Sequence, residues 1–163
     1  MGLYECIGFI YNPIMDKSLY FEEYLPGMTI GTTARTITET DVVNFSCLSG
    51  DFNPLHADIE YAKKTIFGQR IAHGLLGLSV LTGLADNLGF IRESVVGFVG
   101  LTWKFMKPVL FGDTIRGEFT VIKTRGLGAQ GLVVMGVKII NQKGETVGAG
   151  EWTMMMKKKP NAG

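Results

Sequence analysis

The sequence has few charged residues and no region dominated by charge of one sign. Only 19% of its residues are charged, and the formal net charge is +1. Nucleic-acid-binding proteins usually carry a basic patch or stripe, and solvating tails carry a block of acids. Neither pattern occurs here, and we interpret the short basic run at 157–159 as a solvated chain end. We therefore expect no nucleic-acid partner.

Cysteine is scarce, and a secretion signal is lacking. Cys6 and Cys47 lie far apart without the paired spacing of a zinc site or a redox dithiol, so we expect two free thiols. The start of the chain contains Glu5 and lacks the basic start and apolar run of a signal peptide. These absences favour a cytoplasmic protein.

The chain is long enough to bury a core, and 46% of its 163 residues are hydrophobic. We expect one domain over residues 25–157, followed by a short tail at 158–163. Residues 1–24 are rich in Tyr and Phe but show neither helical nor strand periodicity. We interpret them as an extension packed on the domain.

Helix signals are concentrated in the first half. Thr38 begins the run TETD, in which Asp41 can reach back to the free amides of a first helical turn, and Gly50 can end that helix. Residues 71–85 contain no Asp, Glu, Lys or Arg, and their apolar side chains fall on every side of a helix. We expect this helix in the interior, because the stretch is too short and too rich in Gly, Ser and Thr for a membrane span.

Strand signals dominate the second half. In the run DTIRGEFTV, Ile115, Phe119 and Val121 share one face, and polar residues occupy the other. Consecutive strands without helices between them indicate an antiparallel meander. One buried helix followed by such strands predicts an α+β fold in which the sheet wraps around the helix. The four strand candidates in this half are 94–106, 113–123, 131–141 and 145–156.

One apparent nucleotide motif is better explained as a turn. Residues 126–131, GLGAQG, match the G-x-G-x-x-G pattern, which binds a dinucleotide only where its third glycine opens a helix. Here the β-branched run LVVMGVKII follows, which predicts a strand. We interpret the glycines as a hairpin turn.

Asp51 and His56, in the run SGDFNPLH, are the strongest candidates for chemistry. The Asn53-Pro54 pair favours a turn that can bring the two side chains together. A carboxylate and an imidazole can orient water, remove one proton and supply another. The alternative is a structural turn in which Asp51 or Asn53 only bonds nearby backbone. Two histidines with scattered acids make a poor metal site, so we expect no metal.

A second candidate feature is the pair His73-Gly74, which immediately precedes the apolar helix. A backbone N–H near Gly74 would point from a helix N-terminus, where unpaired donors and the helix dipole favour a developing oxyanion. Glycine also permits a carbonyl to approach closely. Alternatively, the two residues merely make a tight turn into the helix.

The long run SGDFNPLHADIEYAKKTIFGQRIAHGLLGLSVLTGL, together with FMKPVLFGDTI at 105–115, resembles the MaoC-like dehydratase family, the R-specific enoyl-CoA hydratases. The similarity covers roughly residues 20–156, and the G-D-x-N-P-x-H motif is complete. The resemblance implies a hot-dog fold, with a central helix at about 74–88, assembled as a homodimer or as dimers of dimers. Family members are hydro-lyases of fatty acid metabolism that add water to a trans-2-enoyl thioester, giving an (R)-3-hydroxyacyl thioester, and catalyse the reverse dehydration.

The resemblance also implies roles for single residues. Asp51 and His56 would hold and activate the water, and Gly74 would present its backbone N–H to the thioester carbonyl. Asn53 would brace the catalytic loop, and His73 would contact the substrate.

A weaker implied role concerns Thr82, which falls where a small hydroxyl residue often supports the site. CoA would be the carrier of the substrate and not a bound cofactor. Lys104, Lys107 or Arg70 would meet its phosphates, unless they are ordinary surface charges. Two alternatives stay open, a hot-dog acyl-CoA thioesterase and a non-catalytic protein that binds acyl thioesters.

Overall fold

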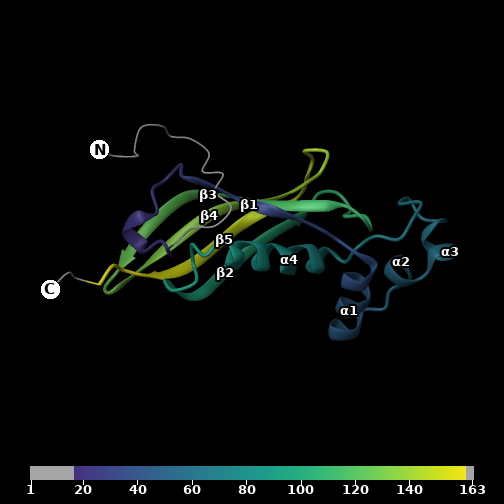
Figure 1. Cartoon of the computed structure of the whole chain (residues 1–163), viewed down its shortest axis with the longest axis horizontal. Helices are drawn as coiled ribbons and strands as arrows, with labels where there is room; N and C mark the ends of the chain where they lie inside the picture. Colours follow the sequence, from purple (N-terminus) through teal and green to yellow (C-terminus); the bar gives the residue numbers. More distant parts are fainter. Residues whose placement is uncertain (1–16, 161–163) are drawn as a thin grey trace.

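The computed structural model describes residues 17–160, which form a five-stranded sheet and a set of helices (Figure 1). Most of the predicted N-terminal extension therefore lies outside the described residues. The helices are η1 (Phe21–Glu23), α1 (Glu39–Ser49), α2 (Pro54–Ala57), α3 (Ile59–Ala62) and α4 (Gly74–Asn87). The strands are β1 (Thr29–Thr36), β2 (Val95–Phe105), β3 (Thr114–Leu127), β4 (Gln130–Asn141) and β5 (Thr146–Lys157).

All strand pairs in the sheet are antiparallel, in the order β1-β3-β4-β5-β2. The four strand segments expected in the second half and the central helix are confirmed. The GLGAQG run forms the β3–β4 hairpin, in which Leu127 pairs with Gln130 and Gly128 adopts a φ of +53°. A helix does not start there, so the hairpin interpretation of these glycines is confirmed.

Helix α4 packs against one face of the sheet, touching β1, β3 and β4. Leu81 on α4 is fully buried. A Cβ added at Gly117 of β3 would lie only 2.3 Å from Cδ1 of Leu81, so the helix packs closely on the strand at this glycine. Phe119 and Trp152 complete this part of the core with their rings 5.3 Å apart. The antiparallel sheet around a long helix is the expected hot-dog architecture.

The expectation that α4 is enclosed on every side is wrong for one stripe. Leu75, Ser79, Thr82 and Asp86 are exposed, because the five strands cover only one side of the helix in a single chain. The apolar composition of residues 71–85 therefore does not predict that the helix is completely buried within one chain. No helix among residues 17–160 is both long and apolar enough to span a membrane.

Helices α1 to α3 and their connections form an arm, residues 38–70, that extends beyond one end of the sheet (Figure 1). The start of α1 follows the predicted capping pattern: Asp41 N–H donates to the Thr38 hydroxyl at 3.3 Å, and Thr38 N–H donates to the Asp41 carboxylate at 2.8 Å. Gly50 ends α1 with a φ of +75°, also as expected. Cys47 on α1 is an exposed free thiol, and Cys6 lies outside the described residues.

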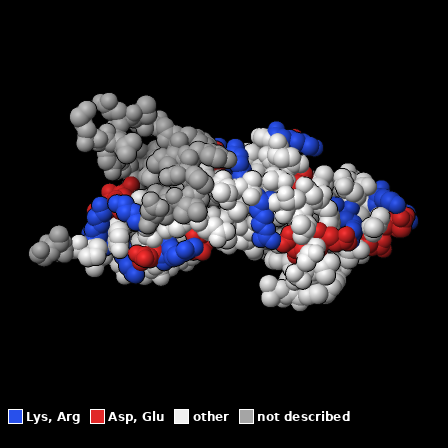
Figure 2. Space-filling view, in the orientation of Figure 1, with Lys and Arg blue, Asp and Glu red and all other residues white. Residues whose placement is uncertain are grey.

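The described part of the N-terminal extension contributes to the core. Leu19 and Tyr24 are buried, and Leu19 N–H donates to the Phe90 carbonyl at 2.8 Å. Figure 2 shows basic and acidic side chains side by side on the visible face, which agrees with the mixed charges along the sequence.

Candidate active site

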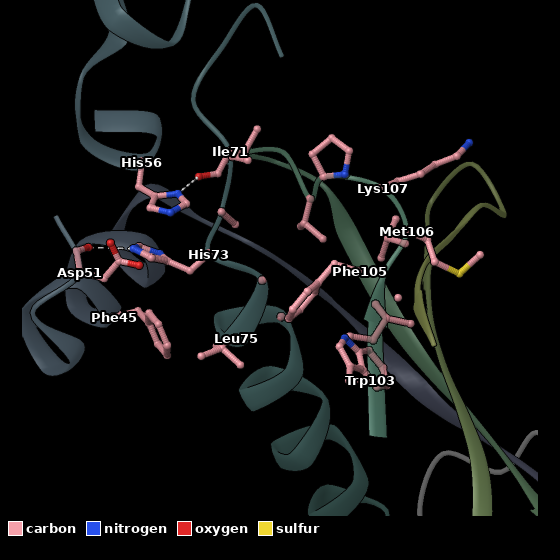
Figure 3. Close-up of a pocket in the computed structure, with 18 of the residues that line it drawn as sticks. Phe45, Asp51, His56, Ile71, His73, Leu75, Trp103, Phe105, Met106 and Lys107 are labelled. Carbon is pink, nitrogen blue, oxygen red and sulfur yellow. Dashed lines mark hydrogen bonds between the residues drawn. The ribbon is translucent and has the colours of Figure 1, made fainter. Parts of the chain in front are cut away.

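A cavity of about 640 Å³ lies where the arm meets the start of α4 and the end of β2 (Figure 3). Asp51, His56 and His73 line it on the arm side of α4, and Trp103 and Phe105 line it from β2. Most of its lining is apolar. The cavity therefore combines a small polar group with a larger apolar wall, as binding sites for small molecules commonly do.

The loop from Gly50 to His56 places the carboxylate and the imidazole on one side of a tight turn. Asn53 N–H donates to the Asp51 carboxylate at 3.2 Å, and Leu55 N–H donates to the Asn53 side chain at 3.0 Å, which caps α2. The His56 amide donates to the Asn53 carbonyl at 2.9 Å. Asn53 thus makes hydrogen bonds within the turn through its amide N–H, its side chain and its carbonyl.

The ring of His56 has a defined orientation. Its Nδ1 atom lies 2.7 Å from the Ile71 carbonyl oxygen. A carbonyl only accepts, so Nδ1 must carry a hydrogen, and Nε2 is the ring nitrogen that can take up a proton. This is the tautomer that a general base needs.

Residues 71–74, which connect the arm to α4, are fixed by backbone hydrogen bonds. Ile71 N–H donates to the Leu55 carbonyl at 3.1 Å, and Ala72 N–H donates to the Val109 carbonyl at 2.8 Å. Ile71 also forms an isolated antiparallel bridge with Leu110. The connection that orients His56 is therefore attached both to the arm and to the segment after β2.

Gly74 is the first residue of α4, and it is exposed at the cavity. The N–H groups of a first helical turn have no acceptor within the helix, and they are aligned with the positive end of its dipole. A Cβ added at Gly74 would lie 2.6 Å from Cε1 of Phe105. A side chain at residue 74 would therefore collide with Phe105, and glycine is what lets this ring pack against the start of α4.

The sequence matches the family model described as MaoC like domain over residues 22–143, most of the chain. The chain belongs to the MaoC-like family. Protein MaoC of Klebsiella aerogenes is 42% identical over 101 residues, which are 62% of this chain and 30% of that protein. An (R)-specific enoyl-CoA hydratase of Rhodospirillum rubrum is 35% identical over 102 residues, covering 63% of this chain and 69% of the relative.

Solved structures agree with the family assignment. The unliganded R-hydratase PhaJ1 from Pseudomonas aeruginosa superposes with a TM-score of 0.73 at 30% sequence identity, covering 87% of this chain and 88% of that one. The match to Protein MaoC spans less than a third of that protein's length, so this MaoC-like domain corresponds to one part of it.

His73 of this MaoC-like domain lies at the wall of the cavity and is nearly fully buried. Only 3% of its surface is exposed, and its ring stacks on that of His56 with centroids 3.7 Å apart and planes at 31°. Its Nε2 atom lies 3.0 Å from the Asp51 carbonyl oxygen. The ring lies at the wall of the cavity but directs its polar contact to the protein.

The two histidines and Asp51 could in principle hold a metal ion, because one donor atom from each lies within 4.8 Å of the others. The two rings overlap with a 31° tilt between their planes, and one nitrogen of each already contacts a backbone carbonyl. One nitrogen of each ring is left for another partner.

Thr82 is not brought to the cavity of the single chain. It lies two turns beyond Gly74 on the exposed stripe of α4, and its hydroxyl donates to the Ser79 carbonyl at 2.6 Å. Within the described residues of the single chain, Thr82 therefore does not line the cavity in which it was expected to support the site.

Basic residues near the cavity are engaged with acids. Lys107 lines the cavity and lies 2.6 Å from the Glu145 carboxylate, and this hydrogen bond lowers the pKa of Glu145 below its ordinary value. Arg70 lies 2.7 Å from the Glu39 carboxylate.

Sequence reasoning missed the β2 wall of the cavity. Trp103 was expected only to belong to a strand, and Phe105, which begins the family-like run FMKPVLFGDTI, was not expected at the site. Alternation along β2 could have shown which of its side chains share a face, but not that this face meets the start of α4.

Proposed function

We propose that the protein is an (R)-specific hydratase/dehydratase that adds water reversibly to a trans-2-enoyl-CoA and gives an (R)-3-hydroxyacyl-CoA. The observation that carries this proposal is the grouping of Asp51 and His56 beside the free helix-terminal amide of Gly74 in one apolar cavity. The names of the relatives, which include (R)-specific enoyl-CoA hydratases, support the same reaction class.

In the hydration direction, the carboxylate of Asp51 accepts one hydrogen of a water molecule and orients it. Nε2 of His56, left free by the bond between Nδ1 and Ile71, removes the other proton as the water oxygen bonds to the β-carbon. Protonated His56 then gives this proton to the α-carbon from the same face. The product contains all atoms of the water, and the pair returns to its starting protonation state.

The negative charge that forms during the attack moves to the thioester oxygen. The N–H of Gly74 donates to this oxygen, and the N-terminal end of the α4 dipole favours the charge. Because the thioester carbonyl itself withdraws electrons from the double bond, we propose a reaction without metal or redox cofactor. CoA is then part of the substrate.

The acyl chain has a matching environment. Trp103, Ile139 and Val147 contribute apolar side chains to the lining of the cavity. The cavity volume of about 640 Å³ lies within the usual range of roughly 300–1,000 Å³ for ligand sites. These side chains would keep water away from the enolate except for the molecule held by the pair.

We also propose that the protein is a homodimer, formed through β2. This strand is at the edge of the sheet, and Phe98, Val99 and Leu101 on it are each about half exposed. A long apolar edge strand is a template for pairing with another strand. Light scattering should give the mass of two chains at micromolar concentration, and a monomeric mass would refute the dimer.

The assay for the proposed activity follows the loss of enoyl-thioester absorbance when purified protein is added to trans-2-enoyl-CoA of graded chain lengths. We expect turnover without added metal or nicotinamide, and an (R) product by chiral analysis. Thiol release from saturated acyl-CoA, measured in parallel, tests the thioesterase alternative. Binding without turnover would instead favour a non-catalytic thioester-binding protein, and either result would overturn the proposal.

A further inference from the structure

His73 contacts both proposed catalytic side-chain residues: it hydrogen-bonds to the backbone of Asp51 and stacks on the ring of His56. A residue that only contacted the substrate would not need either contact. His73 immediately precedes Gly74, the proposed oxyanion donor, and caps α4 without a side-chain bond to the helix. Its ring is instead turned toward the arm, where it meets Phe45 and Ser46 of α1. With 3% of its surface exposed, the ring has little area left for a ligand.

The contact with Asp51 fixes the backbone that carries the carboxylate. Because the Asp51 carbonyl only accepts, Nε2 of His73 must carry a hydrogen and donate it across 3.0 Å. Ser46 Oγ lies 3.3 Å from the same nitrogen and links it to the last turn of α1. Asp51 itself is exposed and follows the left-handed Gly50, so this bond to a buried ring restrains an otherwise open loop.

The contact with His56 fixes the plane of the base. The two rings stack at 3.7 Å, and the bond from His56 Nδ1 to Ile71 sets the rotation within that plane. Ile71 and His73 belong to the same four-residue connection as Gly74. One short segment therefore sets the carboxylate, the base and the oxyanion donor relative to each other.

The remaining nitrogen of His73 shows what the imidazole contributes. Nδ1 is buried and has no hydrogen-bond partner among the described residues. A phenyl ring would fill the same space and stack on His56 without burying an unpaired polar atom. What imidazole adds over a phenyl ring at this position is the N–H donated to Asp51.

These contacts indicate a role for His73, and this role rests on the proposed function. We propose that His73 is a positioning residue that holds Asp51 and His56 in register for the same water molecule, and does not bind the substrate. It acts through two contacts: the hydrogen bond to the Asp51 backbone and the stack against His56.

Two substitutions separate these contacts. His73→Phe keeps a ring for stacking but removes the N–H, and His73→Gln keeps an N–H donor of similar reach but removes the ring. Since a misplacement of about 1 Å can cost up to roughly 100-fold in rate, we expect His73→Phe to lower kcat about 10- to 100-fold with KM within about twofold. His73→Gln should recover part of that loss. Circular dichroism and thermal unfolding of each variant establish that it is folded.

The split between kcat and KM decides between positioning and substrate binding. A raised KM at unchanged kcat in His73→Phe would indicate that His73 binds the substrate, and it would overturn the inference. Wild-type kcat in His73→Phe would overturn it as well, because the donated N–H would then be irrelevant.

A measurement on the wild-type protein needs no turnover and no variant. The chain has two histidines, so isotope-labelled histidine gives nuclear magnetic resonance signals from only two rings. We expect the hydrogen on Nε2 in His73 and on Nδ1 in His56. A hydrogen on Nδ1 of His73 would overturn the inference. An inactive wild-type protein would instead refute the proposed hydratase activity, and the tautomer would still decide the position of His73.

Discussion

The sheet with α4 and the arm differ in what holds them together. The sheet has antiparallel ladders between all neighbouring strands, and its interior contains fully buried Phe119 and nearly fully buried Trp152. In the arm, α1 buries only Val42 and Ser46, and α2 buries none of its residues. Yet the arm carries both Asp51 and His56. The stability of the molecule therefore comes mainly from one region and the proposed chemistry from the other.

The division has a physical reason. A carboxylate and an imidazole that handle water must be reachable by water, so they cannot lie among the core side chains. The arm compensates for its poor packing with directional contacts: an Asx-type turn, a helix cap and the bonds of residues 71–73. Substitutions in the two regions should thus affect different measured quantities.

The largest expected effect is on turnover, from Asp51→Asn and His56→Ala. Each removes a group that exchanges a proton with the water, so we expect kcat to fall roughly 100- to 10,000-fold. The free energy of unfolding should change little, because Asp51 is exposed and His56 is only partly buried. Steady-state hydration kinetics and urea unfolding measure the two quantities.

Asp58→Asn is the matched control for Asp51→Asn. Asp58 is also an exposed aspartate of the arm, and its carboxylate caps α3 by accepting from Tyr61 N–H at 2.9 Å. Asparagine is an equally good cap, so activity and stability should both stay at wild-type values. Full activity in both site variants would contradict the assigned roles and leave Asp51 and His56 as turn residues.

The opposite pattern is expected from Phe119→Ala in the sheet. Phe119 is fully buried between Phe90 and Trp152, and truncation of such a ring leaves a cavity. We expect the free energy of unfolding to fall by about 3–5 kcal/mol. Turnover per folded molecule, measured well below the midpoint of unfolding, should stay within about twofold, because Phe119 does not line the active-site cavity. A large loss of kcat in the folded variant would show that the two regions are coupled.

The same contrast explains how far the sequence could be interpreted. The strands were predictable because alternation along 113–121 reflects burial on one face, and the start of α1 was predictable because Thr38 and Asp41 bond within one turn. These signals are local. The pairing of Asp51 with His56 could also be expected, since only four residues separate them and Asn53-Pro54 favours a turn.

What the sequence could not give depends on contacts between distant segments. The burial of His73 under His56 requires the connection 71–74 to return against the arm, and no local pattern specifies that return. The same holds for Phe105, which meets Gly74 only because β2 ends beside the start of α4. The exposed stripe of α4 was missed because an apolar composition does not tell whether the same chain or a second one covers a helix.

The smallest expected effect concerns the attachment of the arm to the sheet at Asp41. Burial would raise the pKa of this carboxyl, but the hydrogen bonds from Thr38 and the charge of Arg35 outweigh it and hold the pKa below its ordinary value. The folded state thus binds the proton less readily than the unfolded chain. The carboxylate contributes stability above the ordinary aspartate pKa of about 3.9, and this contribution is lost as the pH falls through the lower, folded-state value.

In urea unfolding from pH 7 downward, the difference in the free energy of unfolding between wild type and Asp41→Asn should therefore shrink in acid, while hydration kinetics at pH 7 stay unchanged. A difference that is constant with pH would mean that the cap works through its hydrogen-bonding shape and not through its charge.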